Sequence, residues 1–255
     1  MGFDTLVHIM IQGIHGKMGQ TLFNLIAQRT DCTVVAGVDS KVLPCSVPVF
    51  PTLAQCDVAA DVLIDFSNPS ATDASLSVCA EKKLPCVICT TGLSAQTQNK
   101  LQETAAQIAV FQSANMSLGI NLLILLAKQA NTILGTDFDV EIIEKHHRNK
   151  IDAPSGTALM LADAIRDTGV APYTDVYNRQ AQRKKRDVAE IGIHSVRGGS
   201  IVGEHEVLFA GQDEVITLTH SASSRDVFAS GAIHAALFLT KCPAGLYEMK
   251  DLLKQ

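Results

Sequence analysis

The fold class is decided near the N-terminus by the stretch Leu6-Val-His-Ile-Met-Ile-Gln-Gly13-Ile-His-Gly16-Lys-Met-Gly19. A short apolar run leads into three glycines and then into a helical pattern, whose apolar stripe consists of Met18, Leu22, Leu25 and Ile26. The next apolar run, Thr33–Val38, is closed by Asp39. A strand, a glycine turn, a helix, a second strand and an acidic residue, in that order, are typical of a dinucleotide-binding unit.

Each glycine of this turn has its own expected role. Gly13 permits the tight turn, Gly16 lets backbone N–H groups approach a pyrophosphate, and Gly19 allows the helix to pack closely on the strand. The start of the helix adds partial positive charge where the phosphates would lie. We therefore expect this turn to bind the phosphates of a nicotinamide dinucleotide.

The choice between NADH and NADPH stays open at this point. Asp39 is placed to accept hydrogen bonds from an adenosine ribose, and its charge would repel a 2′-phosphate. Lys17 and Lys41 could instead accept a 2′-phosphate. The spacing is G-x-x-G-x-x-G rather than G-x-G-x-x-G, so the glycines alone do not define the adenine end of the site.

Apolar runs and helical patterns continue to alternate up to Ser113. The further runs are 61–66, 84–89 and 108–111, and helices are expected after Asn68-Pro69 and over 94–107. Such alternation is typical of βαβ units and predicts a parallel sheet covered on both faces.

A different pattern begins after Ser113. We expect a long helix over 118–134 with its apolar face in the core, a strand over 138–142 and a helix over 157–167. Three runs, 191–196, 200–210 and 215–219, follow without intervening helices and predict antiparallel pairing of consecutive strands. The basic run Arg183–Arg186 is interpreted as a solvated loop, and a last helix is expected over 225–239. These elements indicate a second, α+β domain with a mixed sheet.

Composition excludes several classes of protein. A net charge of −5 and a pI near 5.9 argue against nucleic-acid binding. Seven scattered cysteines suit a reducing compartment better than a disulfide framework. No secretory signal is visible, and the most apolar internal segment, Leu118–Ala127, falls short of the ~20 residues of a membrane span. We expect a soluble cytoplasmic protein with no membrane partner.

The stretch 141–158, Glu-Ile-Ile-Glu-Lys-His-His-Arg-Asn-Lys-Ile-Asp-Ala-Pro-Ser-Gly-Thr-Ala, gathers proton donors and an anion site. His146, His147 and Lys150 supply acidic protons or positive charge. Gly156 and Thr157 open a helix, where backbone N–H groups suit a carboxylate. A zinc site is disfavoured because adjacent histidines on a strand point to opposite faces. The pair Cys86 and Cys89 is interpreted as buried small apolar residues rather than a redox pair.

The run Glu144–Ala158 resembles the signature E-x-H-H-x-x-K-x-D-A-P-S-G-T-A of the 4-hydroxy-tetrahydrodipicolinate reductase (dihydrodipicolinate reductase) family. The likeness extends to Thr90-Thr91-Gly92, Ala114-Asn115, Gly203-Glu204-His205 and Ser223-Ser224-Arg225. It implies a Rossmann-like dinucleotide-binding domain (1–115 and 226–255) and an α+β mixed-sheet domain (116–225) for substrate binding and tetramerisation. It also implies NADH or NADPH as the cofactor, a small-molecule dicarboxylate substrate, a homotetramer, and a reaction of lysine and diaminopimelate biosynthesis.

The same resemblance implies roles for individual residues. The catalytic histidine and lysine match His146 and Lys150. Substrate contacts match His147, Ser155, Gly156 and Thr157. Cofactor contacts match Gly13, Ile14, His15, Gly16, Lys17, Met18, Asp39, Cys89, Thr90, Thr91, Ser113, Ala114, Asn115, Met116, Arg225 and Phe228. The sequence departs from the family at three places, with Cys89 where glycine is common, Asn68 where many members are basic and Ser40 where some have arginine.

Two other functions are compatible with these residues. One is a related dehydrogenase acting on another imino or amino dicarboxylate. The other is a nucleotide-sensing module without catalysis, which the set of His146, His147, Lys150 and Ser155-Gly-Thr157 disfavours, because a sensor needs no proton donor.

Overall fold

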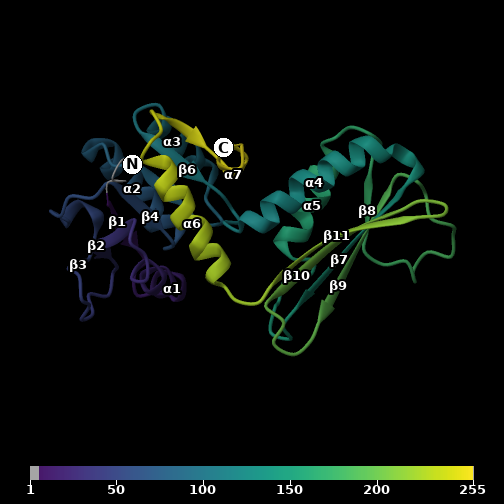
Figure 1. The fold of residues 1–255 in the computed structure, drawn as a ribbon, viewed down its shortest axis with the longest axis horizontal. Coiled ribbons are helices and arrows are strands. Elements are labelled where there is room, and N and C mark those ends of the chain that lie inside the picture. The colour runs from purple at the N-terminus through teal and green to yellow at the C-terminus, as the bar shows by residue number, and fades with distance from the viewer. Residues whose placement is uncertain (1–5, 255) are drawn as a thin grey trace. The chain divides into compact units, whose positions relative to one another are not determined.

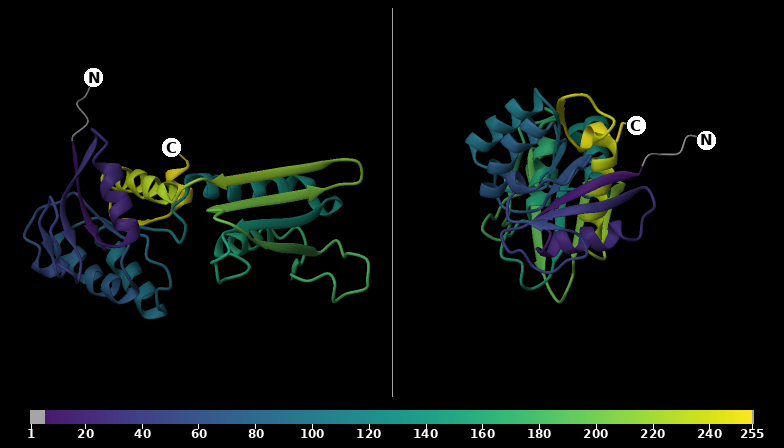
Figure 2. Two further views of the ribbon diagram at one scale, coloured as in Figure 1. Left: turned by 90° about the horizontal axis from the view of Figure 1, so that it is seen from below. Right: turned by 90° about the vertical axis from the view of Figure 1, so that its left-hand side faces the viewer.

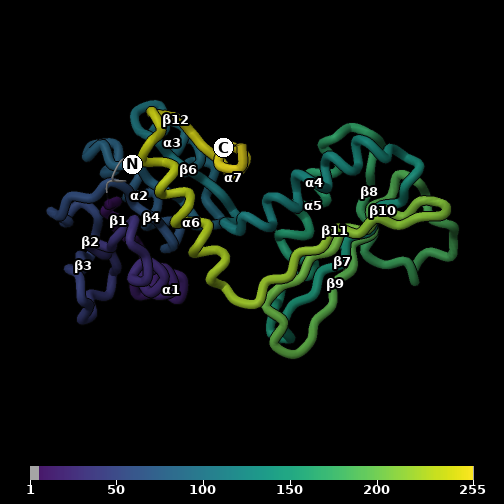
Figure 3. The backbone as a smooth tube through the Cα atoms, in the orientation of Figure 1, coloured from purple at the N-terminus to yellow at the C-terminus, as the bar shows by residue number. Residues whose placement is uncertain are grey.

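The computed structural model describes residues 6–254, and Figure 3 traces their path. The chain forms two units. The first comprises the described residues up to Leu118 together with those from Arg225 onward, and the second comprises Gly119–Ser224. The second unit is therefore an insertion within the sequence of the first.

Seven strands, all paired in parallel, form the sheet of the first unit in the order β12-β6-β5-β4-β1-β2-β3. The strands are β1 (Val7–Gln12), β2 (Cys32–Val38), β3 (Val49–Phe50), β4 (Val62–Asp65), β5 (Cys86–Ile88), β6 (Ala109–Gln112) and β12 (Gly245–Tyr247). The helices are α1 (Lys17–Ile26), α2 (Pro69–Lys82), α3 (Ala95–Ala105), α6 (Asp226–Leu239) and α7 (Met249–Leu252), with a 3-10 turn η1 (Leu53–Gln55). The predicted Rossmann-like class is confirmed, and Figure 1 shows its elements.

Helices cover both faces of this sheet, which explains why its strands are apolar at successive positions. Ile9 and Ile11 of β1 pack with α1, α6 and α7 in one core. Met10, between them, packs with α2 and α3 in the other core. Neighbouring residues of a strand point to opposite faces, so each strand needs apolar side chains throughout.

A five-stranded mixed sheet forms the second unit, in the order β11-β10-β7-β9-β8. Its strands are β7 (Asp139–His146), β8 (Thr174–Val176), β9 (Glu190–Arg197), β10 (Gly203–Ala210) and β11 (Val215–Ala222). The helical elements are α4 (Leu118–Leu134), η2 (Gly135–Asp137) and α5 (Gly156–Arg166). α4 and α5 pack on one face over β7, β9 and β10. β10 and β11 form the long antiparallel pair seen in Figure 2.

The prediction that consecutive strands pair here is correct for β10 with β11 and wrong for β9 with β10. β7 lies between β9 and β10, parallel to the former and antiparallel to the latter. Residues 198–202 therefore cross two strand spacings, about 10 Å, which five extended residues can span. The local sequence pattern does not indicate that β7 lies between β9 and β10.

α4 is apolar on more than one side. The prediction that its apolar face lies in the core is correct for some of its apolar residues only. Ile120, Leu123 and Ala127 are buried. The exposed apolar side chains are Leu122, Leu125, Leu126 and Ile133. The span Leu118–Asp137 is long and apolar enough to cross a membrane by length and composition only, a test that core helices of soluble proteins also pass.

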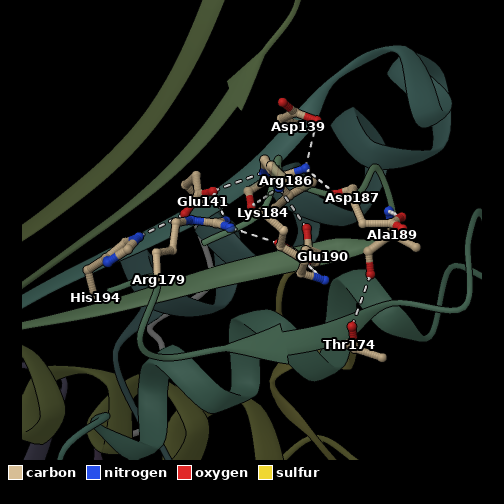
Figure 4. A network of polar contacts seen from close by, with 11 residues as sticks. Asp139, Glu141, Thr174, Arg179, Lys184, Arg186, Asp187, Ala189, Glu190 and His194 are labelled. Carbon is tan, nitrogen blue, oxygen red and sulfur yellow. Dashed lines mark hydrogen bonds and ion pairs between the residues drawn. The ribbon is translucent and has the colours of Figure 1, made fainter. Parts of the chain in front are cut away.

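The basic run Arg183–Arg186 is not a fully solvated loop. Arg186 is ion-paired with Asp139 at 2.6 Å and with Glu141 at 3.1 Å. Figure 4 shows the network, in which Arg179 also joins Glu141 to Glu190. The interpretation as a solvated loop is wrong for Arg186, because its acidic partners lie far away in sequence and give no local signal.

Candidate functional site

The glycine turn of the first unit is packed too closely to admit a side chain at Gly13 or Gly19. Gly13 follows β1 with φ +80°, and a Cβ there would lie 2.9 Å from the carbonyl oxygen of Phe66. A Cβ on Gly19 would overlap the carbonyl oxygen of Gly13, so α1 packs directly on the turn. Gly16 caps α1 without a side-chain hydrogen bond. The first N–H groups of α1 thus point toward the place where a phosphate would bind.

Asp39 is held beside this turn by backbone donors. Its Oδ2 accepts from the N–H of His15 at 3.1 Å, and its Oδ1 accepts from the N–H of Lys41 at 3.1 Å. Gly13, Gly16 and Asp39 all line a cavity of about 480 Å³. This volume lies in the range of small-molecule sites, about 300–1,000 Å³, so the residues present fit the nucleoside end of a dinucleotide.

Further predicted cofactor residues follow the carboxyl ends of neighbouring parallel strands. Thr90 follows β5 and Ser113 follows β6, while Gly13 and Asp39 follow β1 and β2. The crevice outside these strand ends is where doubly wound sheets bind ligands. Thr90 is buried, and its Oγ1 has no hydrogen-bond partner among the described residues. An unpartnered buried hydroxyl at this edge fits a polar group of a bound cofactor.

Several predicted cofactor residues turn their side chains away from the crevice. Ile14, Cys89 and Met116 are buried in the core between the sheet and α6. Burial raises the pKa of the Cys89 thiol well above its ordinary value. Any contact these three make with a cofactor must therefore come from the backbone. Cys89 in place of glycine adds a core side chain.

The remaining predicted cofactor residues lie at helix starts and turns. Exposed Lys17 and half-buried Met18 begin α1, while Thr91 and Ala114 are exposed in the turns after β5 and β6. Asn115 is buried and accepts from the N–H of Ser117 at 2.9 Å. Arg225 is exposed at the start of α6, and Phe228 packs partly against the core.

In the second unit, His146 ends β7 on the face that packs against the helices. Positions 140, 142, 144 and 146 of this strand are all buried. The first two are apolar, but Glu144 and His146 put a carboxylate and an imidazole in the same row. His146 Nδ1 lies 2.5 Å from Glu144 Oε2. Burial lowers the pKa of His146, while the carboxylate of Glu144 opposes that shift.

Lys150 and the start of α5 lie on the loop that follows β7. Lys150 Nζ is 2.9 Å from Asp152 Oδ1. Ser155 caps α5, since its Oγ accepts from the N–H of Ala158 at 3.2 Å. The N–H groups of Gly156 and Thr157 therefore stand at the positive end of the helix dipole, where a carboxylate binds favourably.

Two histidines near this helix start have unpartnered ring nitrogens. Ser155 Oγ is 2.9 Å from His205 Nε2. The Nδ1 atoms of His147 and His205 are buried and have no hydrogen-bond partner within residues 6–254. The structure thus brings His146, Ser155 and His205 together, since His205 contacts both of the others.

Comparison with known proteins identifies the family. The family model described as "Dihydrodipicolinate reductase, N-terminus" matches residues 7–116, and the one described as "Dihydrodipicolinate reductase, C-terminus" matches residues 119–253. The chain belongs to the dihydrodipicolinate reductase family. The resemblance inferred from the sequence is thereby confirmed.

Relatives of this family match along nearly the whole chain. The 4-hydroxy-tetrahydrodipicolinate reductase of Caldanaerobacter subterraneus is 48% identical, covering 98% of this chain and 99% of the relative. That of Clostridium tetani is 47% identical, covering 97% of each. The solved structure of a dipicolinate-bound dihydrodipicolinate reductase from Paenisporosarcina sp. TG-14 has a TM-score of 0.82 and 27% identity, covering 96% of this chain and 98% of that one.

Sequence reasoning did not assign a role to Glu144, Arg197 or His205. Glu144 carried a usable signal, because an acid at a buried position of an alternating strand must have a partner. Arg197 carried none, since its contact with Glu144 joins residues 53 positions apart.

Proposed function

We propose that this chain catalyses the NAD(P)H-dependent reduction of 4-hydroxy-tetrahydrodipicolinate, or of its dehydrated form, to tetrahydrodipicolinate in lysine and diaminopimelate biosynthesis. The observation that carries the proposal is the second unit's site. A buried acid–histidine pair, a lysine and a helix start lie within one short segment, in a chain of this family. A dicarboxylate imine requires both a proton donor and an anion site.

The first unit is the proposed cofactor-binding domain. Gly13 to Met18 bind the pyrophosphate, Asp39 the adenosine ribose, and Thr90, Thr91 and 113–116 the nicotinamide side. When bound, reduced nicotinamide supplies the hydride. NADH and NADPH are both candidates: the Asp39 carboxylate favours NADH, and Lys17 with Lys41 offers positive charge for NADPH.

The second unit is the proposed substrate domain. His147, Ser155, Gly156 and Thr157 bind a substrate carboxylate at the start of α5. As negative charge develops on the conjugated substrate, Lys150 donates a proton and His146 acts as the acid/base. Lys150 also contributes positive charge to hold the dianionic substrate.

We further propose that the enzyme is a cytoplasmic homotetramer assembled through the second unit. Support comes from the family resemblance and from the seven cysteines, all of which are free thiols in this structure. A reducing compartment suits a protein with that many unpaired thiols.

The test is cofactor oxidation with substrate made freshly from pyruvate and aspartate semialdehyde by the preceding synthase. Consumption of NADH or NADPH only when that substrate is present supports the proposal, and comparing the two cofactors measures the preference. His146→Gln and Lys150→Met should each sharply reduce turnover and leave cofactor binding near normal. Tight cofactor binding without turnover would favour a sensor or another dicarboxylate substrate.

A further inference from the structure

Glu144 is a fully buried carboxylate to which the proposed mechanism assigns no step. Its side chain has 0% exposure, and it stands on β7 two residues before His146. A buried ionised group is costly unless charged and hydrogen-bonding partners compensate it. The identity of those partners shows what the carboxylate does.

Both oxygens of Glu144 are fully engaged. Arg197 of β9 binds them with two parallel donors, Nη1 to Oε2 at 2.7 Å and Nη2 to Oε1 at 2.7 Å. The N–H of Ser155 donates to Oε1 at 3.1 Å. Burial raises the pKa of Glu144, but hydrogen bonds from Arg197, Ser195 and His146 outweigh it and bring the pKa to about 2. The carboxylate is therefore ionised throughout the working pH range.

An ionised carboxylate can only accept hydrogen bonds, so the proton between Glu144 and His146 belongs to Nδ1 of the histidine. The imidazole then has Nε2 left for proton exchange. Gly203 of β10 keeps that nitrogen clear, since a Cβ there would lie 3.1 Å from His146 Nε2. His205 packs against the ring edge-on, with 5.1 Å between ring centroids, and restricts its rotation.

Arg197 also reaches the loop that carries the second candidate catalytic residue. Its Nη2 donates to the carbonyl oxygen of Asp152 at 2.5 Å. The side chain of Asp152 is the ion-pair partner of Lys150. The ion pair between buried Glu144 and half-buried Arg197 thus connects β7, β9 and the loop, and both candidate proton-transfer groups contact it directly or through Asp152.

We propose that Glu144 and Arg197 are a positioning pair that fixes His146 as the Nδ1–H tautomer, directs Nε2 to the substrate, and anchors the Lys150 loop. This inference rests on the proposed reductase function for its kinetic consequences. Its structural part, the tautomer of His146, stands independently of any substrate.

Four charged or titratable groups face His146 and influence the pH at which its imidazole is protonated. Glu144 lies on the same strand, Arg197 on β9, His205 on β10, and Lys150 on the loop. Glu144 raises the pKa of His146, whereas burial, Lys150 and Arg197 lower it. Replacing Glu144 by glutamine removes the raising contribution. A protonated His146 would then persist only to a lower pH.

The first experiment is nuclear magnetic resonance of the wild-type protein carrying ¹⁵N-labelled histidine. The chain has eight histidines, so His146→Gln assigns the signal. We expect neutral His146 to show a protonated Nδ1 and an unprotonated Nε2. A predominant Nε2–H tautomer would overturn the proposal. This readout needs neither substrate nor turnover, so it is separate from the success or failure of the proposed function.

The second experiment compares Glu144→Gln with Glu214→Gln. Glu214 is an exposed glutamate in the β10–β11 turn, and it forms no ion pair with any of residues 6–254. A well-placed general acid contributes about 10²–10⁴-fold to rate, so misplacing it should cost kcat roughly 10- to 100-fold. KM for the cofactor should stay near the wild-type value, and the pH at which kcat declines should move down.

Glu214→Gln should match the wild type in kcat and pH profile. Equal kcat and an unmoved pH profile in a folded Glu144→Gln variant would refute the positioning role. If Glu144→Gln does not fold, Glu144→Asp replaces it in the test. Aspartate keeps the negative charge, but its side chain is one methylene shorter, so the carboxylate lies farther from His146. A folded Glu144→Asp with unchanged kcat and an unchanged His146 spectrum would likewise refute it, whereas a fall in kcat with a changed tautomer ratio supports it.

Discussion

Replacing Gly19 by alanine tests whether α1 must touch the glycine turn. The added Cβ would overlap the carbonyl oxygen of Gly13 and lie 2.8 Å from both Cα and O of Ile14. All three are backbone atoms, so no rotamer change can relieve the overlap and α1 must move. Overpacking of this kind costs about 1–3 kcal/mol. Because α1 starts at the proposed phosphate site, the same movement should weaken cofactor binding.

The assay is thermal unfolding together with a titration of NADH followed by its fluorescence. For units of this length, 1 kcal/mol corresponds to about 2–4 °C in Tm, so we expect a fall of roughly 2–12 °C. Gly198→Ala is the matched control, since a Cβ there meets nothing within 4 Å. If Gly19→Ala behaves like Gly198→Ala in both Tm and Kd, the close-packing argument is wrong.

Three further predictions concern single side chains. Asp39→Ala should raise KM for NADH about ten-fold or more, because a hydrogen bond to a charged group contributes about 1.5–3 kcal/mol. The same substitution should shift the cofactor preference toward NADPH. An unchanged KM for both cofactors would contradict the proposed contact between Asp39 and the ribose. Ser155→Ala removes the cap of α5 and should lower the free energy of unfolding by about 1 kcal/mol, measured in urea, while raising KM for substrate more than KM for cofactor. The pKa of Glu144 is about 2, below its ordinary 4.5, so its contribution to stability is complete above pH 4.5 and is lost as pH falls toward 2. Glu144→Gln should therefore show a flatter dependence of Tm on pH over that interval, and a slope equal to the wild type's would show that another group dominates.

The parts of the fold with a local signal could be predicted from the sequence. The first strand, its glycine turn and the helix after it follow one another within residues 6–26, so pattern and turn chemistry were sufficient. The insertion of β7 between β9 and β10 could not be predicted, because strand pairing over long separations depends on the sheet as a whole. Arg186 shows the same limit, since it hydrogen-bonds Asp139, 47 positions earlier.

The candidate site was predictable to a similar extent. The run from Glu144 to Ala158 carries its residues in one continuous segment, so a motif could identify them. Arg197 lies on a different strand, β9, and belongs to no recognisable motif. The sequence gives no sign that Arg197 binds both the carboxylate of Glu144 and the carbonyl oxygen of Asp152.

The insertion of the second unit within the first has a consequence for biosynthesis on the ribosome. α6, which follows the insertion, supplies Ala229, Ala232, Ile233 and Leu239 to a core that also contains residues of β1, β4 and α1. That core cannot close until the whole insertion has been translated. The inserted unit, whose sheet and helices are contiguous in sequence, can finish folding first. A nascent chain stalled near Ser224 would present an open apolar sheet face, the kind of surface that chaperones hold until the last helix emerges.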